Sequence, residues 1–74
     1  MWKKGKIEVN GKAFWYWAKV FDKGSIFGID EGRISKLEIR LDDETVANYD
    51  RGWDIRPTDA DAEKAYEKIL ELYK

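Results

Sequence analysis

The 74-residue sequence contains no cysteine, no histidine and a single proline. Disulfide bonds are therefore excluded, and the common zinc sites lose both of their usual ligands. Without histidine, no hydroxyl group has the base that most often activates it as a nucleophile. No apolar run approaches the length of a membrane span, and no apolar segment typical of a secretory signal follows the basic N-terminus. We therefore expect a cytoplasmic protein that is not an enzyme, with no metal, no cofactor, no small-molecule substrate and no contact with a membrane.

The segment that organises the chain is residues 12–21, KAFWYWAKVF, which follows Asn10-Gly11. Asn-Gly between two alternating segments predicts a type I′ hairpin turn, because both central residues of that turn need a positive φ. Aromatic and β-branched residues dominate the segment, which favours a strand from Lys12 to Phe21 paired with an earlier strand from Lys3 to Val9.

The two-residue turn fixes the register of this hairpin and divides its side chains between two faces. The first face is aliphatic and aromatic, as expected of a layer that packs on the core; it holds Ile7, Val9, Phe14, Tyr16, Ala18 and Val20. The second, which we name the Trp/Lys face, alternates three indoles with three ammonium groups: Trp2, Trp15 and Trp17 with Lys4, Lys6 and Lys19. This pattern fits neither an ordinary solvated face nor an ordinary core, so it marks the candidate binding surface.

Turn-forming residues follow the hairpin, and alternation then predicts two further strands. The glycine-rich segment 22–32 contains Ile26, Phe27 and Ile29, which we expect to fold back as a flap over one end of the sheet; a mobile recognition loop is the alternative. The third strand is predicted from Arg33 to Leu41, with its outer face charged. After a turn at 42–44, the fourth strand is predicted from Thr45 to Tyr49.

The segment 50–57, DRGWDIRP, allows two interpretations. In the structural one, arginine and aspartate side chains pair around a bulge at Gly52, while Trp53 and Ile55 enter the core. In the functional one, Tyr49, Arg51 and Trp53 form a binding edge next to the Trp/Lys face.

Pro57 then precedes the only predicted helix, with Thr58 as its N-cap and an apolar stripe of 3.6-residue period on one side.

These elements predict an α+β fold: a four-stranded antiparallel sheet of two hairpins followed by one C-terminal helix packed on one face, in a single ββββα domain over residues 1–74. One helix covers only one face of a sheet. If it covers the first face, the three indoles of the Trp/Lys face expose roughly 500 Å² or more, which is at the upper end for a monomer.

The Trp/Lys face, together with Tyr49 and Arg51, should therefore be covered by something: the flap at 26–29, a second copy of the chain, a protein target or a single-stranded nucleic acid. We expect self-association or binding of a protein partner, because tryptophan and tyrosine are enriched in such interfaces. Single-stranded nucleic acid is the alternative, with bases stacked on the indoles and lysines on the phosphates. The net charge is −1, with +4 over residues 1–41 and −5 over residues 42–74. This asymmetry favours head-to-tail self-association or an anionic ligand, unless the lysines only protect a strand edge from aggregation.

Three segments carry a resemblance to a known family: Phe27-Gly28-Ile29, the run 32–37 (GRISKL) and the run 48–54 (NYDRGWD). Together they resemble a family of short uncharacterised proteins from Firmicutes and their phages or mobile elements. The resemblance implies a cytoplasmic, phage-associated protein of one domain. Because many short phage proteins act by occupying a host or defence protein, it also favours a role as an inhibitor of such a partner.

Overall fold

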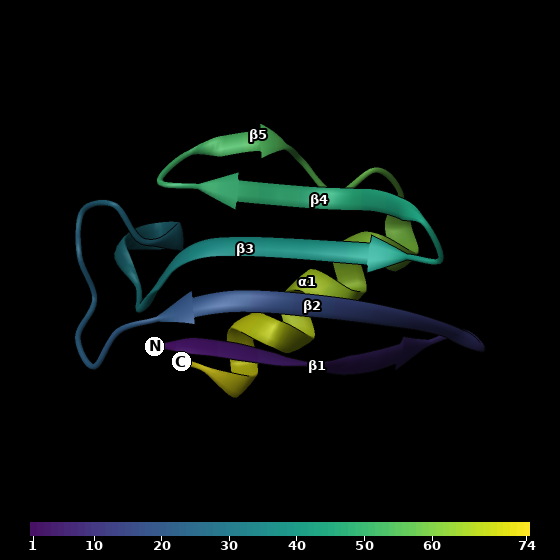
Figure 1. Cartoon of the computed structure of the whole chain (residues 1–74), viewed down its shortest axis with the longest axis horizontal. Helices are drawn as coiled ribbons and strands as arrows, with labels where there is room; N and C mark the ends of the chain where they lie inside the picture. Colours follow the sequence, from purple (N-terminus) through teal and green to yellow (C-terminus); the bar gives the residue numbers. More distant parts are fainter.

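The structure, a computed structural model that describes residues 1–74, is a five-stranded antiparallel sheet with one α-helix on one of its faces (Figure 1). The strands follow one another in the sheet in chain order: β1 (Trp2–Val9), β2 (Lys12–Val20), β3 (Ile34–Leu41), β4 (Glu44–Asp50) and β5 (Trp53–Ile55). A short 3-10 helix, η1 (Ile29–Glu31), interrupts the long β2–β3 connection, and α1 (Ala60–Leu72) follows β5. The α+β class and the C-terminal helix are confirmed, whereas the sheet has five strands instead of four.

The first hairpin has the predicted register. Asn10 and Gly11 both have positive φ, 50° and 79°, as a type I′ turn requires. Lys6 pairs with Trp15 and Lys4 with Trp17. The side chains of β1 and β2 therefore divide between the two faces as the sequence predicts.

The fifth strand arises from the segment 50–57. The chain reverses at Arg51, whose φ is 57°, and β5 then pairs with β4, with Trp53 opposite Tyr49 and Ile55 opposite Asn48. A strand of three residues is too short to show an alternating pattern, which is why the sequence did not predict it. The expected burial is right for Trp53, which packs against the core, but wrong for Ile55, which stays exposed beside Asn48.

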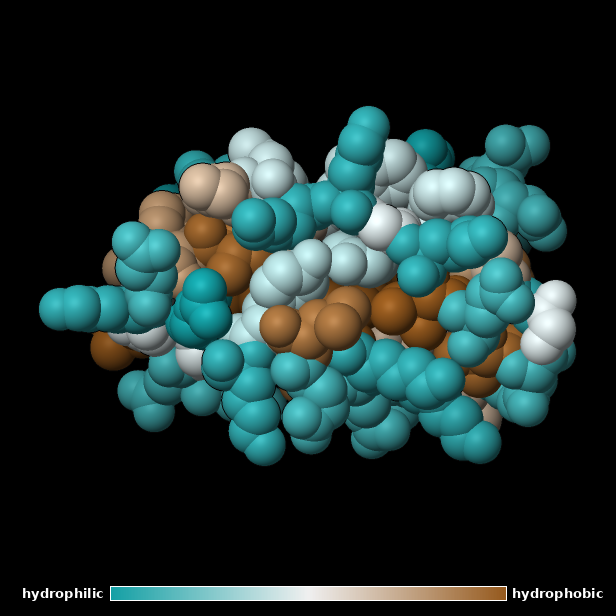
Figure 2. All heavy atoms as spheres, turned by 90° about the horizontal axis from the view of Figure 1, so that it is seen from below, coloured by the Kyte–Doolittle hydropathy of each residue, from teal (hydrophilic) through white to brown (hydrophobic).

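The core lies between the first face of the sheet and α1, which passes behind the strands in Figure 1. Figure 2, an edge-on view, shows brown apolar atoms between two outer layers of paler and teal atoms. The helix contributes Ala62, Ala65 and Ile69 to this core. Small alanine side chains allow the helix to approach the sheet closely, so that the large sheet residues Phe14 and Leu37 become fully buried.

The helix begins one residue later than Thr58 predicts. The N-cap is Asp59, whose carboxylate accepts a hydrogen bond from the Ala62 backbone N–H at 2.9 Å. Asp61, in the first turn of the helix, accepts a hydrogen bond from Asn10 Nδ2 at 2.7 Å, and its Oδ2 lies 3.1 Å from Lys12 Nζ of β2. Its hydrogen bond with Asn10 and the nearby ammonium group hold the pKa of the Asp61 carboxyl below its usual range. This contact ties the hairpin turn to the helix N-terminus.

The expected flap is only partly formed. Ile29 is buried in the core, but Ile26 and Phe27 are 76% and 54% exposed. The Tyr49 hydroxyl donates to the Phe27 carbonyl oxygen at 3.0 Å, which fixes the loop on the helix side of the sheet. The two apolar side chains at the tip therefore do not cover the Trp/Lys face.

Candidate interaction surface

The Trp/Lys face is the side of the sheet opposite α1, and no other part of the chain covers it. It faces the viewer in Figure 1, in front of the helix. Trp2, Trp15 and Trp17 are 60%, 50% and 38% exposed. Their positions follow from period-two alternation in β1 and β2, because the neighbouring residues Phe14, Tyr16 and Ala18 all point into the core.

Cross-strand pairing sets each indole of this face beside a lysine. Trp2 is opposite Lys19, Trp17 is opposite Lys4 and Trp15 is opposite Lys6. The Lys6 ammonium lies 5.7 Å from the centroid of the Trp15 ring, within the range of a cation–π contact. It also lies 3.5 Å from a carboxylate oxygen of Glu8. Lys4 and Lys19 take part in no ion pair.

The face continues onto β3, which brings three charged residues that the sequence analysis left out of the site. The register places Arg40 beside Trp15, Glu38 beside Trp17 and Lys36 beside Lys19. Period-two alternation along the predicted third strand already indicated that these three residues share one side of that strand. Which of its sides adjoins the indoles depends on pairing between β2 and β3, which no local pattern fixes.

Charges of both signs on this part of the face pair with one another. Arg40 Nε lies 3.3 Å from Glu38 Oε2, and Lys36 Nζ lies 3.8 Å from Asp50 Oδ1. The Thr45 hydroxyl donates to Glu38 at 3.2 Å. A hollow of about 270 Å³ lies beside these pairs, and its lining includes Trp2, Trp17, Lys36, Glu38, Asn48 and Asp50.

Tyr49 does not belong to this face, contrary to the expectation of a binding edge with Arg51. Tyr49 is 8% exposed and lies opposite Leu37 in the core layer. A regular hairpin after the turn at 42–43 would place Tyr49 opposite Lys36, on the Trp/Lys face. A bulge at Val46 adds one residue to β4 and so moves Tyr49 to the other face.

The remaining residues of that expected edge also lie apart. Trp53 packs edge to face against Tyr49, with ring centroids 5.2 Å apart, and belongs to the core side. Arg51 is exposed at the β4–β5 turn, where its Nε lies 3.6 Å from Asp50 Oδ1. Of the edge, only Arg51 is near the rim of the Trp/Lys face, through its contact with Asp50.

The chemistry of the face is that of contact and charge. Apart from Lys4 and Lys19, the acids and bases described above take part in ion pairs with one another. No three carboxylates of the chain gather closely enough to hold a metal ion. No helix of the chain has both the length and the apolar character needed to cross a bilayer. The exposed groups on offer are indole surfaces, ammonium groups and a few carboxylates.

A family model described as "Domain of unknown function (DUF7678)" matches residues 1–74, the whole chain. No curated protein and no solved structure matches it.

Proposed function

We propose that this chain, which belongs to the DUF7678 family, is a small non-enzymatic module that binds protein through its Trp/Lys face. In the absence of another partner, two copies of the chain pair through that face. The observation that carries the proposal is the exposure of Trp2, Trp15 and Trp17 on a sheet face that the chain itself leaves uncovered.

The size of the face supports pairing with a protein. The molecule extends 33 by 21 Å across the plane of the sheet, which corresponds to a face of roughly 700 Å², close to the ~800 Å² per partner of a standard interface. Each aromatic side chain buries about 150–250 Å² when fully covered. Because the three indoles are 60%, 50% and 38% exposed, covering them would remove roughly 220–370 Å² of aromatic surface from water. This is less than the roughly 500 Å² expected from the sequence, but it is a substantial part of the apolar contact that such an interface needs.

The charges of the face also suit a protein better than a polyanion. Glu8, Glu38 and Asp50 lie among the bases of the face, and each takes part in an ion pair with one of them. A polar rim with charges of both signs around exposed aromatic groups is typical of protein interfaces. Lys4 and Lys19, which have no carboxylate partner in the chain, are available to carboxylates of the bound protein.

The resemblance of the sequence to short proteins of Firmicutes and their phages or mobile elements extends this proposal. In that setting the module acts in the cytoplasm and occupies a host or defence protein as an inhibitor. The Trp/Lys face is then the surface that contacts the target.

The proposal is tested by the solution mass of the Trp15→Ser/Trp17→Ser double variant. We expect the wild-type chain to sediment as a dimer or larger species at about 100 μM and the variant as a monomer. Circular dichroism should be unchanged, because neither indole belongs to the core or packs against it. Phe27→Ser is the matched control, since it removes an equally exposed aromatic ring away from the face. A monomeric wild-type chain, or a double variant of unchanged mass, would contradict the proposed self-association.

Single-stranded nucleic acid is the second candidate, favoured by the unpaired Lys4 and Lys19 beside Trp17 and Trp2. Bases would stack on the indoles while the ammonium groups meet phosphates. This mode predicts quenching of tryptophan fluorescence by an oligothymidine at low salt and a steep loss of affinity as salt is added. The absence of quenching at micromolar protein removes this candidate.

A further inference from the structure

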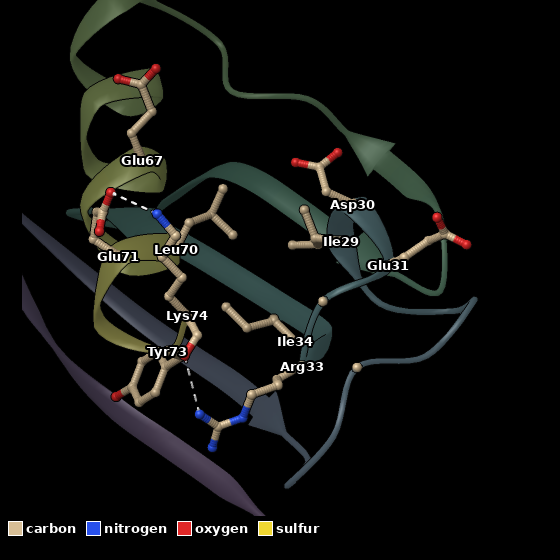
Figure 3. Close-up of a pocket in the computed structure, with 12 residues that line it drawn as sticks. Ile29, Asp30, Glu31, Arg33, Ile34, Glu67, Leu70, Glu71, Tyr73 and Lys74 are labelled. Atoms are coloured by element: carbon tan, nitrogen blue, oxygen red, sulfur yellow. Dashed lines mark hydrogen bonds and ion pairs between the residues drawn. The ribbon is translucent and has the colours of Figure 1, made fainter.

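A cavity of about 780 Å³ lies between the η1 loop and the C-terminal half of α1 (Figure 3). This volume falls within the range of roughly 300–1,000 Å³ that small-molecule sites occupy. The floor is apolar: Leu70 and Tyr73, which are partly exposed, form its accessible surface, and Ile29 and Ile34, which are buried in the core, complete the lining. Because α1 forms one wall, the cavity is on the opposite side of the sheet from the Trp/Lys face and is independent of it.

The rim of the cavity carries more negative than positive charge. It holds four carboxylates and two cations: Asp30, Glu31, Glu67 and Glu71, with Arg33 and Lys74. Both cationic side chains already have partners in the chain: a backbone carbonyl oxygen for Arg33 and a carboxylate for Lys74. Arg33 Nε donates to the Phe21 carbonyl oxygen at 2.8 Å, and Lys74 Nζ lies 3.8 Å from Glu71 Oε1. Asp30, Glu31 and Glu67 take part in no ion pair, and neither does Arg33, so the four carboxylates and two cations leave the rim with a net charge of −2 above an apolar floor.

Asp30 and Glu67 come from different walls. Asp30 belongs to η1 and Glu67 to α1, and Figure 3 shows both at the end of the cavity away from Arg33. The loop wall is tightly closed, because a Cβ atom at Gly28 would collide with the Gly32 carbonyl oxygen. The backbone of Asp30 is held in the left-handed region, with φ 52°. The carboxylate of Asp30 is therefore carried by a compact loop before any ligand arrives.

We propose that this cavity binds a small organic amine, with its ammonium group at the end that holds Asp30 and Glu67 and its apolar body against Leu70 and Tyr73. An ammonium group there forms charge-assisted hydrogen bonds with carboxylates that have no partner in the chain. The apolar body gains from leaving water on the floor of the cavity. An anion is repelled by the same carboxylates, and a neutral analogue keeps only the apolar contact.

The proposal is tested with three probes that share one apolar body: 4-phenylbutylamine, 4-phenylbutanol and 4-phenylbutyrate. Binding is followed by NMR through the methyl groups of Ile29, Ile34 and Leu70. We expect saturable shifts at these methyl groups with the amine, an affinity about fivefold to tenfold lower for the alcohol, and no saturation with the carboxylate. Equal affinities for amine and alcohol, or no saturable shift with the amine, would overturn the proposal.

Variants identify the groups that hold the ammonium. Asp30→Asn and Glu67→Gln should each weaken amine binding by about threefold to tenfold and leave alcohol binding unchanged; asparagine tolerates the left-handed backbone at position 30. Glu63→Gln is the matched control, because Glu63 lies on α1 but does not line the cavity. If Glu63→Gln weakens binding as much as Glu67→Gln, general electrostatic attraction explains the result and the site is wrong. The Trp15→Ser/Trp17→Ser variant should bind the amine as the wild type does, whatever its oligomeric state.

Discussion

The hydroxyl groups of Tyr16 and Tyr73 lie 2.8 Å apart, which joins the middle of β2 to the residue that ends α1. Their rings meet edge to face, with centroids 6.2 Å apart. The two residues are separated by 57 positions in the chain. This contact holds the end of the helix on the first face, and so leaves the other face of the sheet, with its indoles, without a cover.

Replacement of Gly5 by a residue with a Cβ atom should disturb the contact between Tyr16 and Tyr73. Gly5 pairs with Tyr16 across the first hairpin, and a Cβ at this position would lie 2.8 Å from the Tyr16 hydroxyl oxygen. Because the Tyr16 ring is buried and hydrogen-bonded, Gly5→Ala should lower the free energy of unfolding by about 1–2 kcal/mol, measured by urea denaturation. Gly52→Ala, at a position with open space around it, is the control. Equal stability of the two variants would show that the ring moves aside freely.

Because Tyr16 and Tyr66 pack between the sheet and the helix, we expect the protein to lose stability at alkaline pH. Burial and the hydrogen bond with Tyr73 raise the pKa of Tyr16 to about 12; burial, with the carboxylates of Asp30 and Glu63, raises the pKa of Tyr66 to about 12. Between pH 10 and 12 the unfolded chain releases protons that the folded chain retains, so the free energy of unfolding falls as pH rises. Below about pH 10 this contribution is complete.

Urea denaturation at pH 8, 10 and 11.5 measures this decline. Tyr16→Phe and Tyr66→Phe should each make it shallower, because phenylalanine has no proton to lose. An alkaline decline that keeps its full slope in both variants would assign the effect to other groups.

The helix cap can be tested by two neighbouring substitutions. Asp59→Ala removes the carboxylate that accepts from the Ala62 N–H and should cost about 1 kcal/mol of stability. Thr58→Ala should cost less than about 0.5 kcal/mol, since Thr58 contributes only a backbone hydrogen bond to the Val46 carbonyl oxygen. Thermal denaturation followed by circular dichroism at 222 nm compares them. A larger loss of stability for Thr58→Ala than for Asp59→Ala would indicate that Thr58 is the N-cap, as the sequence predicts.

Tryptophans on opposite faces should differ in their contribution to folding. Trp53 packs edge to face against Tyr49 and Tyr66, with centroids 5.2 and 5.3 Å away, so Trp53→Ala should lower the free energy of unfolding by about 2–3 kcal/mol. Trp15→Ser, on the exposed face, should change it by less than about 1 kcal/mol. Urea titrations followed by circular dichroism give both values. Similar losses would mean that the indoles of the Trp/Lys face also stabilise the fold.

Local signals were enough wherever a feature depended on neighbouring residues. Asn10-Gly11 dictated a turn with two positive φ values, and that turn set the register of β1 and β2 residue by residue. Period-two alternation then placed the three indoles and Lys4, Lys6 and Lys19 on one face. The helix and its apolar stripe were predicted for the same reason, although its cap was displaced by one residue.

Features that join distant parts of the chain were beyond these signals. One bulge at Val46 reversed the parity of β4 and moved Tyr49 from the expected face into the core. The cavity combines residues 24–34 with residues 67–74, and no pattern within either segment announces the other.

The sequence by itself determined that the chain would form a hairpin with one apolar side and one side of indoles and lysines, because turn chemistry and alternation act over a few residues. The tertiary structure decided which side the helix would cover, which strand residues would join the exposed face and where a cavity would open. Those outcomes depend on long-range packing, in which a single extra residue in a strand exchanges the two faces of everything that follows it.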